Sequence, residues 1–270
     1  MSNSPTVVSN VVAGAALAVG ADRYAAVALL ALALVLFYTA GMVLNDVWDE
    51  SIDRAERPER PLPSGEVSRQ AAVGAVVLLF GAGSALLLAV AWAAFLSGLV
   101  LILVIVSYDA WHKGNPVGPL LMALARALVY VTAFLALSPD PGLPLLLAAA
   151  ALFVYVASLT AVAKSERRAP SGAWPVALLL LGPIGYALAD PSAAVGGLVL
   201  VLVGWTLYAV SFVHRASGRD VGAAVGHLIA GISLLDAVVV TSAAGLSAGT
   251  VLCLAAFALT LFLQRHVPGT

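Results

Sequence analysis

A succession of long apolar runs constrains the fold of this chain more than any other feature. Most runs are close to 20 residues long, and short polar segments separate them. Of the 270 residues, 62% are hydrophobic and 10% are charged, whereas soluble domains are about 45–50% apolar and about 25% charged. A soluble globule must cover its surface with polar groups, and this sequence has too few of them. The sequence therefore indicates a protein of the lipid bilayer.

The apolar runs are predicted to be transmembrane helices. A helix needs about 20 apolar residues to cross a bilayer, and it satisfies its own backbone hydrogen bonds in lipid. The first run has no positively charged leader, so we expect it to remain as a helix. We predict an all-α, polytopic membrane protein in which residues 1–270 form a single transmembrane domain. Its nine or ten transmembrane helices are expected at residues 6–20, 24–46, 68–90, 93–110, 117–137, 143–163, 173–189, 193–214, 221–242 and 247–264.

The distribution of basic residues predicts the orientation of these helices. With the N-terminus in the cytoplasm, 11 of the 13 Lys and Arg residues fall in cytoplasmic loops or in the C-terminal tail. Such a bias marks the cytoplasmic side of membrane proteins. We therefore expect a multi-pass protein of the cell (inner) membrane. The net charge of −1 gives no sign of a nucleic-acid partner, and the single cysteine, Cys253, excludes a disulfide framework.

The longest polar stretch, residues 45–70, begins with an acidic motif. Asn45, Asp46, Asp49 and Asp53 follow the pattern N-D-x-x-D-x-x-x-D. Residues three, four and seven apart share one face of a helix, so the three aspartates form one acidic stripe with Asn45 at its edge. Crowded carboxylates repel one another unless a cation binds, and ligands that offer only oxygen suit Mg²⁺.

Arginines follow the acidic motif directly. Arg54, Arg57 and Arg60 lie next to the carboxylates, and a guanidinium matches phosphate oxygens in a bidentate way. The segment "RPLPSG" is fixed by its prolines and then turns. The predicted ligand is therefore a diphosphate bridged to the protein by Mg²⁺.

The stretch "NDVWDESIDRAERPERPLPSG" resembles the first aspartate-rich motif of the UbiA superfamily of intramembrane prenyltransferases. The likeness extends to the number of helices and to the polar patches that follow the fourth and sixth helices. The resemblance implies a helical bundle around a central cavity, where Mg²⁺ holds a polyprenyl diphosphate and an aromatic or other lipophilic acceptor is alkylated at the prenyl C1. It implies Asn45, Asp49 and Asp53 as metal ligands, supported by Asp46.

The same resemblance implies further contacts to the diphosphate. Arg57 and Arg60 would contact the diphosphate or hold the loop. The segment "YDAWHKG" matches the tyrosine and basic positions of the family, which makes Tyr108 and Lys113 candidate diphosphate ligands.

The second aspartate-rich motif of the family is altered in this chain. The corresponding segment, "YVASLTAVAKSERRAPSG", contains no aspartate. Glu166 is the remaining candidate metal ligand there, and Lys164 would neutralise phosphate charge as a point cation. This pattern is closest to an EboC-like branch of the family. Asp49, Asp53, Lys113 and Lys164 form the predicted catalytic set.

Two ionisable residues lie within apolar runs. Arg126 and Asp236 are expected to face a cavity or to pair with each other, and Arg126 joins the predicted diphosphate contacts. An allylic cation needs a dry cavity, and aromatic faces stabilise cations. The candidate aromatic residues of the cavity are Phe37, Tyr38, Trp48, Tyr108, Tyr130 and Tyr155.

These residues favour an enzyme that transfers a prenyl group from a polyprenyl diphosphate to a lipophilic acceptor within the membrane. One alternative keeps the diphosphate chemistry without an acceptor, as in a membrane terpene cyclase. Another is a lipid-binding or transport protein that uses the cavity without chemistry, which the loss of the second aspartate motif favours. No pair of Gly/Pro-broken helices marks a midplane ion site. Cleavage of an allylic diphosphate distinguishes the two enzymes from the protein without chemistry.

Overall fold

The computed structural model describes residues 2–18, 24–111, 115, 117–164, 174–214, 218 and 220–267. Within these ranges the chain forms ten α-helices and one short 3-10 helix, with no strand. The prediction of an all-α fold is confirmed. The helices are α1 (Pro5–Ala16), α2 (Tyr24–Glu56), α3 (Arg69–Val90), α4 (Trp92–Trp111), α5 (Gly118–Leu135), α6 (Leu143–Lys164), α7 (Trp174–Ala189), α8 (Ala193–Ser211), η2 (Phe212–His214), α9 (Val221–Ala244) and α10 (Ala248–His266).

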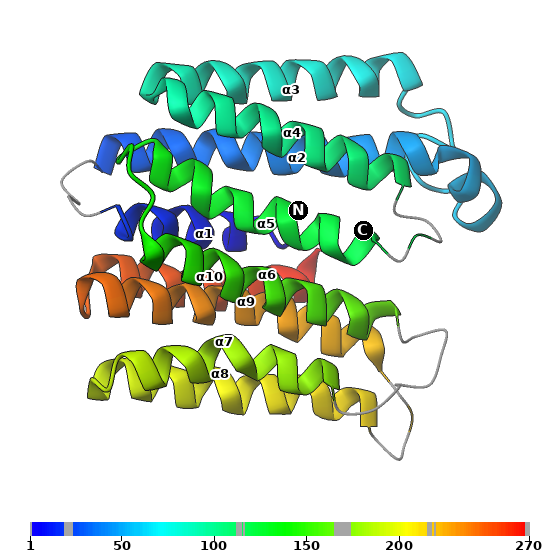
Figure 1. Cartoon of the computed structure of the whole chain (residues 1–270). Helices are drawn as coiled ribbons and strands as arrows, with labels where there is room; N and C mark the ends of the chain where they lie inside the picture. The colour runs from blue at the N-terminus through cyan, green and yellow to red at the C-terminus, as the bar shows by residue number, and fades with distance from the viewer. Residues whose placement is uncertain are drawn as a thin grey trace.

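The helices run side by side as a bundle (Figure 1). Helices α2, α3 and α4 form one side of the bundle, α7 and α8 form the opposite side, and α1, α5, α6, α9 and α10 lie between them. Eight of the described helices are long and apolar enough to cross a membrane, and α1 and α7 are shorter apolar helices. The protein is therefore a multi-pass membrane protein, as the apolar runs predicted.

Helix α2 is longer than predicted. We expected it to end at residue 46, but it continues to Glu56 and carries the whole acidic motif. The prediction was wrong because it followed the apolar run, whereas Asp, Glu and Arg side chains are compatible with a helix that extends beyond the lipid. The helix ends where Arg57 precedes Pro58, because a residue before proline is disfavoured in the helical conformation.

Helix α9 is the central helix of the bundle. In an 18-residue apolar stretch of α9, 72% of the residues are buried, against 17–50% in the other seven long helices. It packs against α1, α6, α8 and α10. The buried residues form two main apolar clusters, one around α9 and one between α2 and α4, and both include residues of α1 and α5. Helices α1 and α5 thus join the two halves of the bundle.

A glycine lets α1 approach α5 closely. A Cβ atom at Gly14 would lie 2.6 Å from the carbonyl oxygen of Tyr130 and 2.9 Å from the Cβ of Ala133. Both distances are shorter than van der Waals contact, so any larger residue would push the helices apart. Small residues at helix contacts are the usual means of close packing in membranes.

Candidate active site

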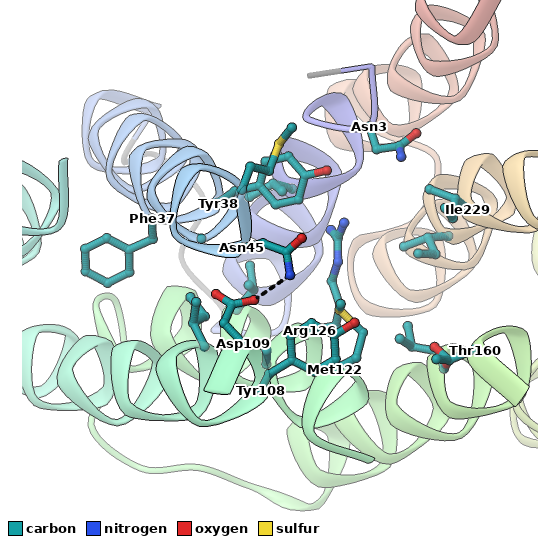
Figure 2. A pocket seen from close by; sticks show the side chains of 18 of the residues that line it. Asn3, Phe37, Tyr38, Asn45, Tyr108, Asp109, Met122, Arg126, Thr160 and Ile229 are labelled. Carbon is teal, nitrogen blue, oxygen red and sulfur yellow. Dashed lines mark hydrogen bonds between the residues drawn. The ribbon is translucent and has the colours of Figure 1, made fainter. Parts of the chain in front are cut away.

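A cavity of about 390 Å³ lies inside the bundle, between α1, α2, α4, α5, α6 and α9. Most of its lining is aliphatic or aromatic, and its polar lining residues are few. The polar and ionisable residues of the lining are Asn3, Tyr38, Asn45, Asp46, Tyr108, Asp109, Arg126 and Thr160. Figure 2 shows several of these side chains pointing into the space between α2, α4 and α5. A cavity of this kind suits an amphiphile that has a polar head and an apolar tail.

Asn45 and Asp46 bring the start of the acidic motif to the cavity. Both residues line it and are half-buried. The Asn45 Nδ2 donates a hydrogen bond of 3.2 Å to Asp109 Oδ1 on α4, as the dashed line in Figure 2 marks. Asp109 is buried and also lines the cavity. Helix α2 and the end of α4 therefore present amide and carboxyl oxygens together.

The remaining aspartates of the motif follow along α2. Asp49 is half-buried, and Asp53 is buried with 6% of its surface exposed. Arg60 Nη1 donates to Asp53 Oδ2 at 2.8 Å and to Asp46 Oδ1 at 3.3 Å. The loop after α2 thus folds back on the acidic face through Arg60, which supports the expectation that this arginine holds the loop.

Loss of the Arg60 side chain is expected to release this loop. Arg60→Ala leaves the buried Asp53 carboxylate without its 2.8 Å partner, which costs about 3 kcal/mol. Backbone hydrogen bonds of the loop, such as Val67 N–H to Pro61 O, should then exchange their amide hydrogens about 100-fold faster. Hydrogen exchange by mass spectrometry measures this. The exposed Arg57→Ala is the control, and equal exchange in both variants would contradict the assignment.

Glu50 lies next to the motif but serves another purpose. Its carboxylate accepts hydrogen bonds of 2.7 Å from Arg54 and from Arg69 at the start of α3. It does not line the cavity. Glu50 thus links α2 to α3, and it provides a matched acidic residue outside the candidate site.

Of the other residues predicted to contact the diphosphate, only some are placed at the cavity. Tyr108 lines the cavity, and Arg57 is exposed to the exterior. Lys113 and Glu166 lie outside the described residues. Lys164 is the last residue of α6, and the position of its side chain is likewise outside what the structure describes.

Of the candidate aromatic residues of the cavity, likewise only some line it. Phe37, Tyr38 and Tyr108 line the cavity. Tyr130 and Tyr155 are fully buried outside the lining, and the Tyr155 hydroxyl donates to Leu228 O at 3.0 Å. The expectation that Trp48 faces the cavity is corrected, because half of its surface is exposed on the outside of α2.

A buried polar network lies below the acidic motif. Arg126 Nη1 donates to Asn10 Oδ1 at 3.1 Å, and Asn10 Nδ2 donates to both carboxylate oxygens of Asp236, at 3.0 and 2.9 Å. The Tyr130 hydroxyl also donates to Asp236. The guanidinium carbon of Arg126 lies 5.4 Å from the centre of the Tyr38 ring. Arg126 and Asp236 are thus connected through Asn10.

Sequence reasoning missed Asn10 and Tyr130 as partners of these charges. Asn10 follows Ser9 in a short, mostly apolar run, a pattern that packed membrane helices commonly contain. The role of Asn10 follows only from its contacts with Arg126 and Asp236, which belong to helices far apart in the sequence. All but Arg126 are fully buried.

The residues at the cavity suit a hard cation that also binds phosphate. In the described part of the chain, no three His, Cys, Asp or Glu side chains converge closely enough to hold a metal ion by themselves. Mg²⁺ does not need such a set, since it is usually bound by one or two carboxylates together with waters and substrate phosphates. The oxygens of Asn45 and Asp46 provide ligands of that type at the cavity, and Asp49 and Asp53 follow on α2 outside the lining.

The fold and the cavity define a polytopic membrane protein with an internal, amphiphile-sized pocket that is acidic at one end. A family model described as the UbiA prenyltransferase family matches residues 7–169, more than half of the chain. The protein belongs to the UbiA prenyltransferase family.

Curated relatives of known name match part of the chain. Digeranylgeranylglyceryl phosphate synthase from Natronomonas pharaonis is 32% identical over 128 residues, which is 47% of this chain and 46% of that protein. The enzyme of the same name from Methanoregula boonei is 43% identical over 89 residues, 33% of this chain and 32% of that protein. The matched region thus spans less than half the length of these relatives.

Solved structures match nearly the whole fold. A UbiA homologue from Aeropyrum pernix K1 has a TM-score of 0.72 and 20% identity, covering 88% of this chain and 97% of its own. A homologue from Archaeoglobus fulgidus, solved with DMAPP and Mg²⁺, has a TM-score of 0.68 and 15% identity, covering 90% and 94%. At these identities the likeness concerns the fold.

Proposed function

We propose that this protein transfers a prenyl group from a polyprenyl diphosphate to a lipophilic acceptor within the membrane, with Mg²⁺ at the acidic motif. The observation that carries the proposal is the apolar cavity whose lining includes Asn45 and Asp46. The family assignment and the Mg²⁺ and DMAPP bound to the Archaeoglobus homologue support it.

The residue roles follow from position and chemistry. Asn45, Asp46 and Asp49 would hold Mg²⁺, with Asp53 as the next carboxylate along the same face. Tyr108 lies within the same lining and would contact the diphosphate. Arg60 would keep the loop closed over the motif through its ion pairs. Lys113, Lys164, Arg57 and Glu166 remain predicted contributors from the neighbouring loops.

The reaction breaks the bond between the prenyl C1 and the diphosphate oxygen. The electron pair leaves with the diphosphate, C1 bonds to a nucleophilic atom of the acceptor, and the acceptor loses a proton. Mg²⁺ held by Asn45, Asp46 and Asp49 would neutralise the charge that grows on the leaving group. The apolar walls, which include Phe37 and Tyr38, exclude water from the allylic cation.

The orientation proposed for the protein places the N-terminus, the acidic motif and the C-terminal tail at the cytoplasmic side of the cell membrane. Eleven of the 13 basic residues support this orientation. A water-soluble diphosphate head would then reach the motif from the cytoplasm, and the prenyl tail would enter from the lipid.

Release of diphosphate tests the proposal. Purified protein in lipid nanodiscs, given geranylgeranyl diphosphate and Mg²⁺, is expected to release diphosphate when a suitable acceptor is present. Chelation of the metal with EDTA should reduce the rate at least about 100-fold, and added Mg²⁺ should restore it. Mass spectrometry of the lipid products separates transfer from cyclisation. A protein that neither binds nor cleaves an allylic diphosphate would contradict the proposal.

A further inference from the structure

The contact between Asn45 and Asp109 joins two helices at the acidic end of the cavity. Asn45 lies on α2 and Asp109 on α4, and the Asn45 Nδ2 donates a hydrogen bond of 3.2 Å to Asp109 Oδ1. Both residues line the cavity, and Figure 2 shows their side chains pointing toward each other. Only Asn45 belongs to the acidic motif, so the α4 carboxylate needs an explanation of its own.

A glycine one helical turn earlier lets the two helices come close enough for this contact. Gly41 precedes Asn45 by four residues, and Ile105 precedes Asp109 by four. A Cβ atom at Gly41 would lie 3.0 Å from the Cγ2 of Ile105, which is closer than an optimal van der Waals contact. The two pairs of residues thus stack one turn apart along α2 and α4. The packing of these helices therefore brings the Asn45 amide against the Asp109 carboxylate.

Asp109 occupies an unfavourable position for a carboxylate that serves the fold alone. Its surface is 5% exposed, and burial of a charge is costly unless the charge is paired or hydrogen-bonded. It also lies two residues before Trp111, the last residue of α4, where the negative end of the helix dipole disfavours an anion. An apolar residue would avoid both costs. The oxygens of Asp109 therefore point to a role at the cavity.

A carboxylate determines which way the Asn45 amide faces. The nitrogen of an amide only donates hydrogen bonds and its oxygen only accepts them, although the two ends are nearly the same in size. An ionised carboxylate only accepts, so Asp109 selects the orientation in which Nδ2 faces α4. Figure 2 shows the Asn45 oxygen turned away from Asp109. The oxygen is the atom of an amide that binds a hard cation.

The orientation of Asn45 matters because the proposed metal ligands are few. Asn45, Asp46 and Asp49 all lie on α2, and of these Asn45 and Asp46 line the cavity. Asp46 also accepts a hydrogen bond of 3.3 Å from Arg60. An Asn45 amide turned the wrong way would direct N–H groups at the cation and would remove one of the two oxygen ligands at the lining.

We infer that Asp109 is a positioning residue, which holds the Asn45 amide so that its oxygen faces the metal. The inference rests on the proposed function and adds α4 to the helices that determine how the metal is held. Asp109 acts through Asn45 and does not itself contact the metal. Replacement of a residue that orients a metal ligand by a hydrogen bond typically weakens metal binding about 10–100-fold.

The affinity for Mn²⁺ in the presence of a non-cleavable geranylgeranyl thiodiphosphate tests the inference. Electron paramagnetic resonance of the free Mn²⁺ measures it in lipid nanodiscs without turnover. Asp109→Leu removes the acceptor and is expected to weaken Mn²⁺ binding at least about tenfold. Asp109→Asn keeps an oxygen that accepts from the Asn45 amide, and its affinity should fall less than about threefold. An equal loss in the two variants would mean that Asp109 binds the metal itself and would overturn the inference.

A double-mutant cycle shows whether Asp109 acts through Asn45. In an Asn45→Ala background the amide is absent, so Asp109→Leu should change the Mn²⁺ affinity less than about twofold. Losses that simply add would overturn the inference. The matched control is Ser97→Ala, which removes a buried hydrogen bond of 2.7 Å from α4 to Thr132 outside the cavity lining. This control should leave the affinity within about twofold of the wild type.

A second substitution guards against a folding defect. If Asp109→Leu does not fold, Asp109→Ala replaces it, because water in the vacated space both donates and accepts and cannot impose the orientation. Its Mn²⁺ affinity should be at least about fivefold below that of the wild type, and an unchanged affinity overturns the inference. Failure of the proposed function has a different signature, since the wild type itself then binds no Mn²⁺ with the thiodiphosphate. A wild type that binds both, with an Asp109→Leu protein that binds them equally well, contradicts the inference alone.

Discussion

Replacement of Asp49 by alanine is expected to lower the rate of diphosphate release at least about 1000-fold. Asp49 lies between Asp46 and Asp53 on the acidic face of α2, one helical turn from the cavity lining. Its loss removes a charged oxygen ligand from the proposed Mg²⁺ site and so removes stabilisation of the leaving group. A coupled assay of diphosphate release with geranylgeranyl diphosphate measures the effect.

The matched control is Glu50→Ala, one residue further along the same helix. Glu50 pairs with Arg54 and Arg69 outside the cavity, and ion pairs at the surface contribute little to stability. Its loss should change the rate less than about threefold. Both variants should unfold within a few degrees of the wild type. An Asp49→Ala protein that keeps a tenth of the activity would place the metal site elsewhere.

Substitution of Gly14 by leucine is expected to destabilise the bundle strongly. The new side chain would meet the backbone of α5 at Tyr130 and the Cβ of Ala133, so α1 must move away from α5. Overpacking of this kind costs about 3 kcal/mol, which corresponds to a fall in melting temperature of roughly 6–12 °C for a domain of this size. A thermal unfolding scan in detergent measures it.

The control for Gly14→Leu is Gly81→Leu on α3. A Cβ atom at Gly81 has no neighbour within 4 Å, so the leucine should be accommodated with little change in stability. Displacement of α1 should also disturb Asn10 and its hydrogen bonds to Arg126 and Asp236. Equal melting temperatures for the two variants would show that the contact of α1 with α5 is unimportant.

The sequence predicted the helices well because each apolar run has the length that a bilayer requires. It also placed Asp46, Asp49 and Asp53 on one helical face, and α2 does continue through all three. The end of α2 was misplaced because hydropathy reports where lipid ends, whereas the helix ends at the proline. The prediction of a central cavity came from the family resemblance, and the cavity is present.

Which helices pack against one another could not be predicted from the sequence, and the reason is physical. Lipid tails and packed side chains are equally apolar, so hydropathy does not distinguish a lipid-facing surface from a buried one. For this reason the central position of α9 and the exposure of Trp48 were invisible. The connection from Arg126 through Asn10 to Asp236 joins α5, α1 and α9, and no spacing along the chain encodes it.

The central claim is that the oxygens of the acidic motif hold a metal-bound diphosphate at the cavity. A structure of the protein in lipid, determined with a non-cleavable prenyl thiodiphosphate and Mn²⁺ in place of Mg²⁺, tests it directly through the anomalous signal of the metal. The account predicts a metal peak about 2.1–2.2 Å from oxygens of Asn45 or Asp49, with the prenyl chain beside Phe37 and Tyr38. Diphosphate bound away from α2, or a prenyl chain outside the cavity, would contradict it.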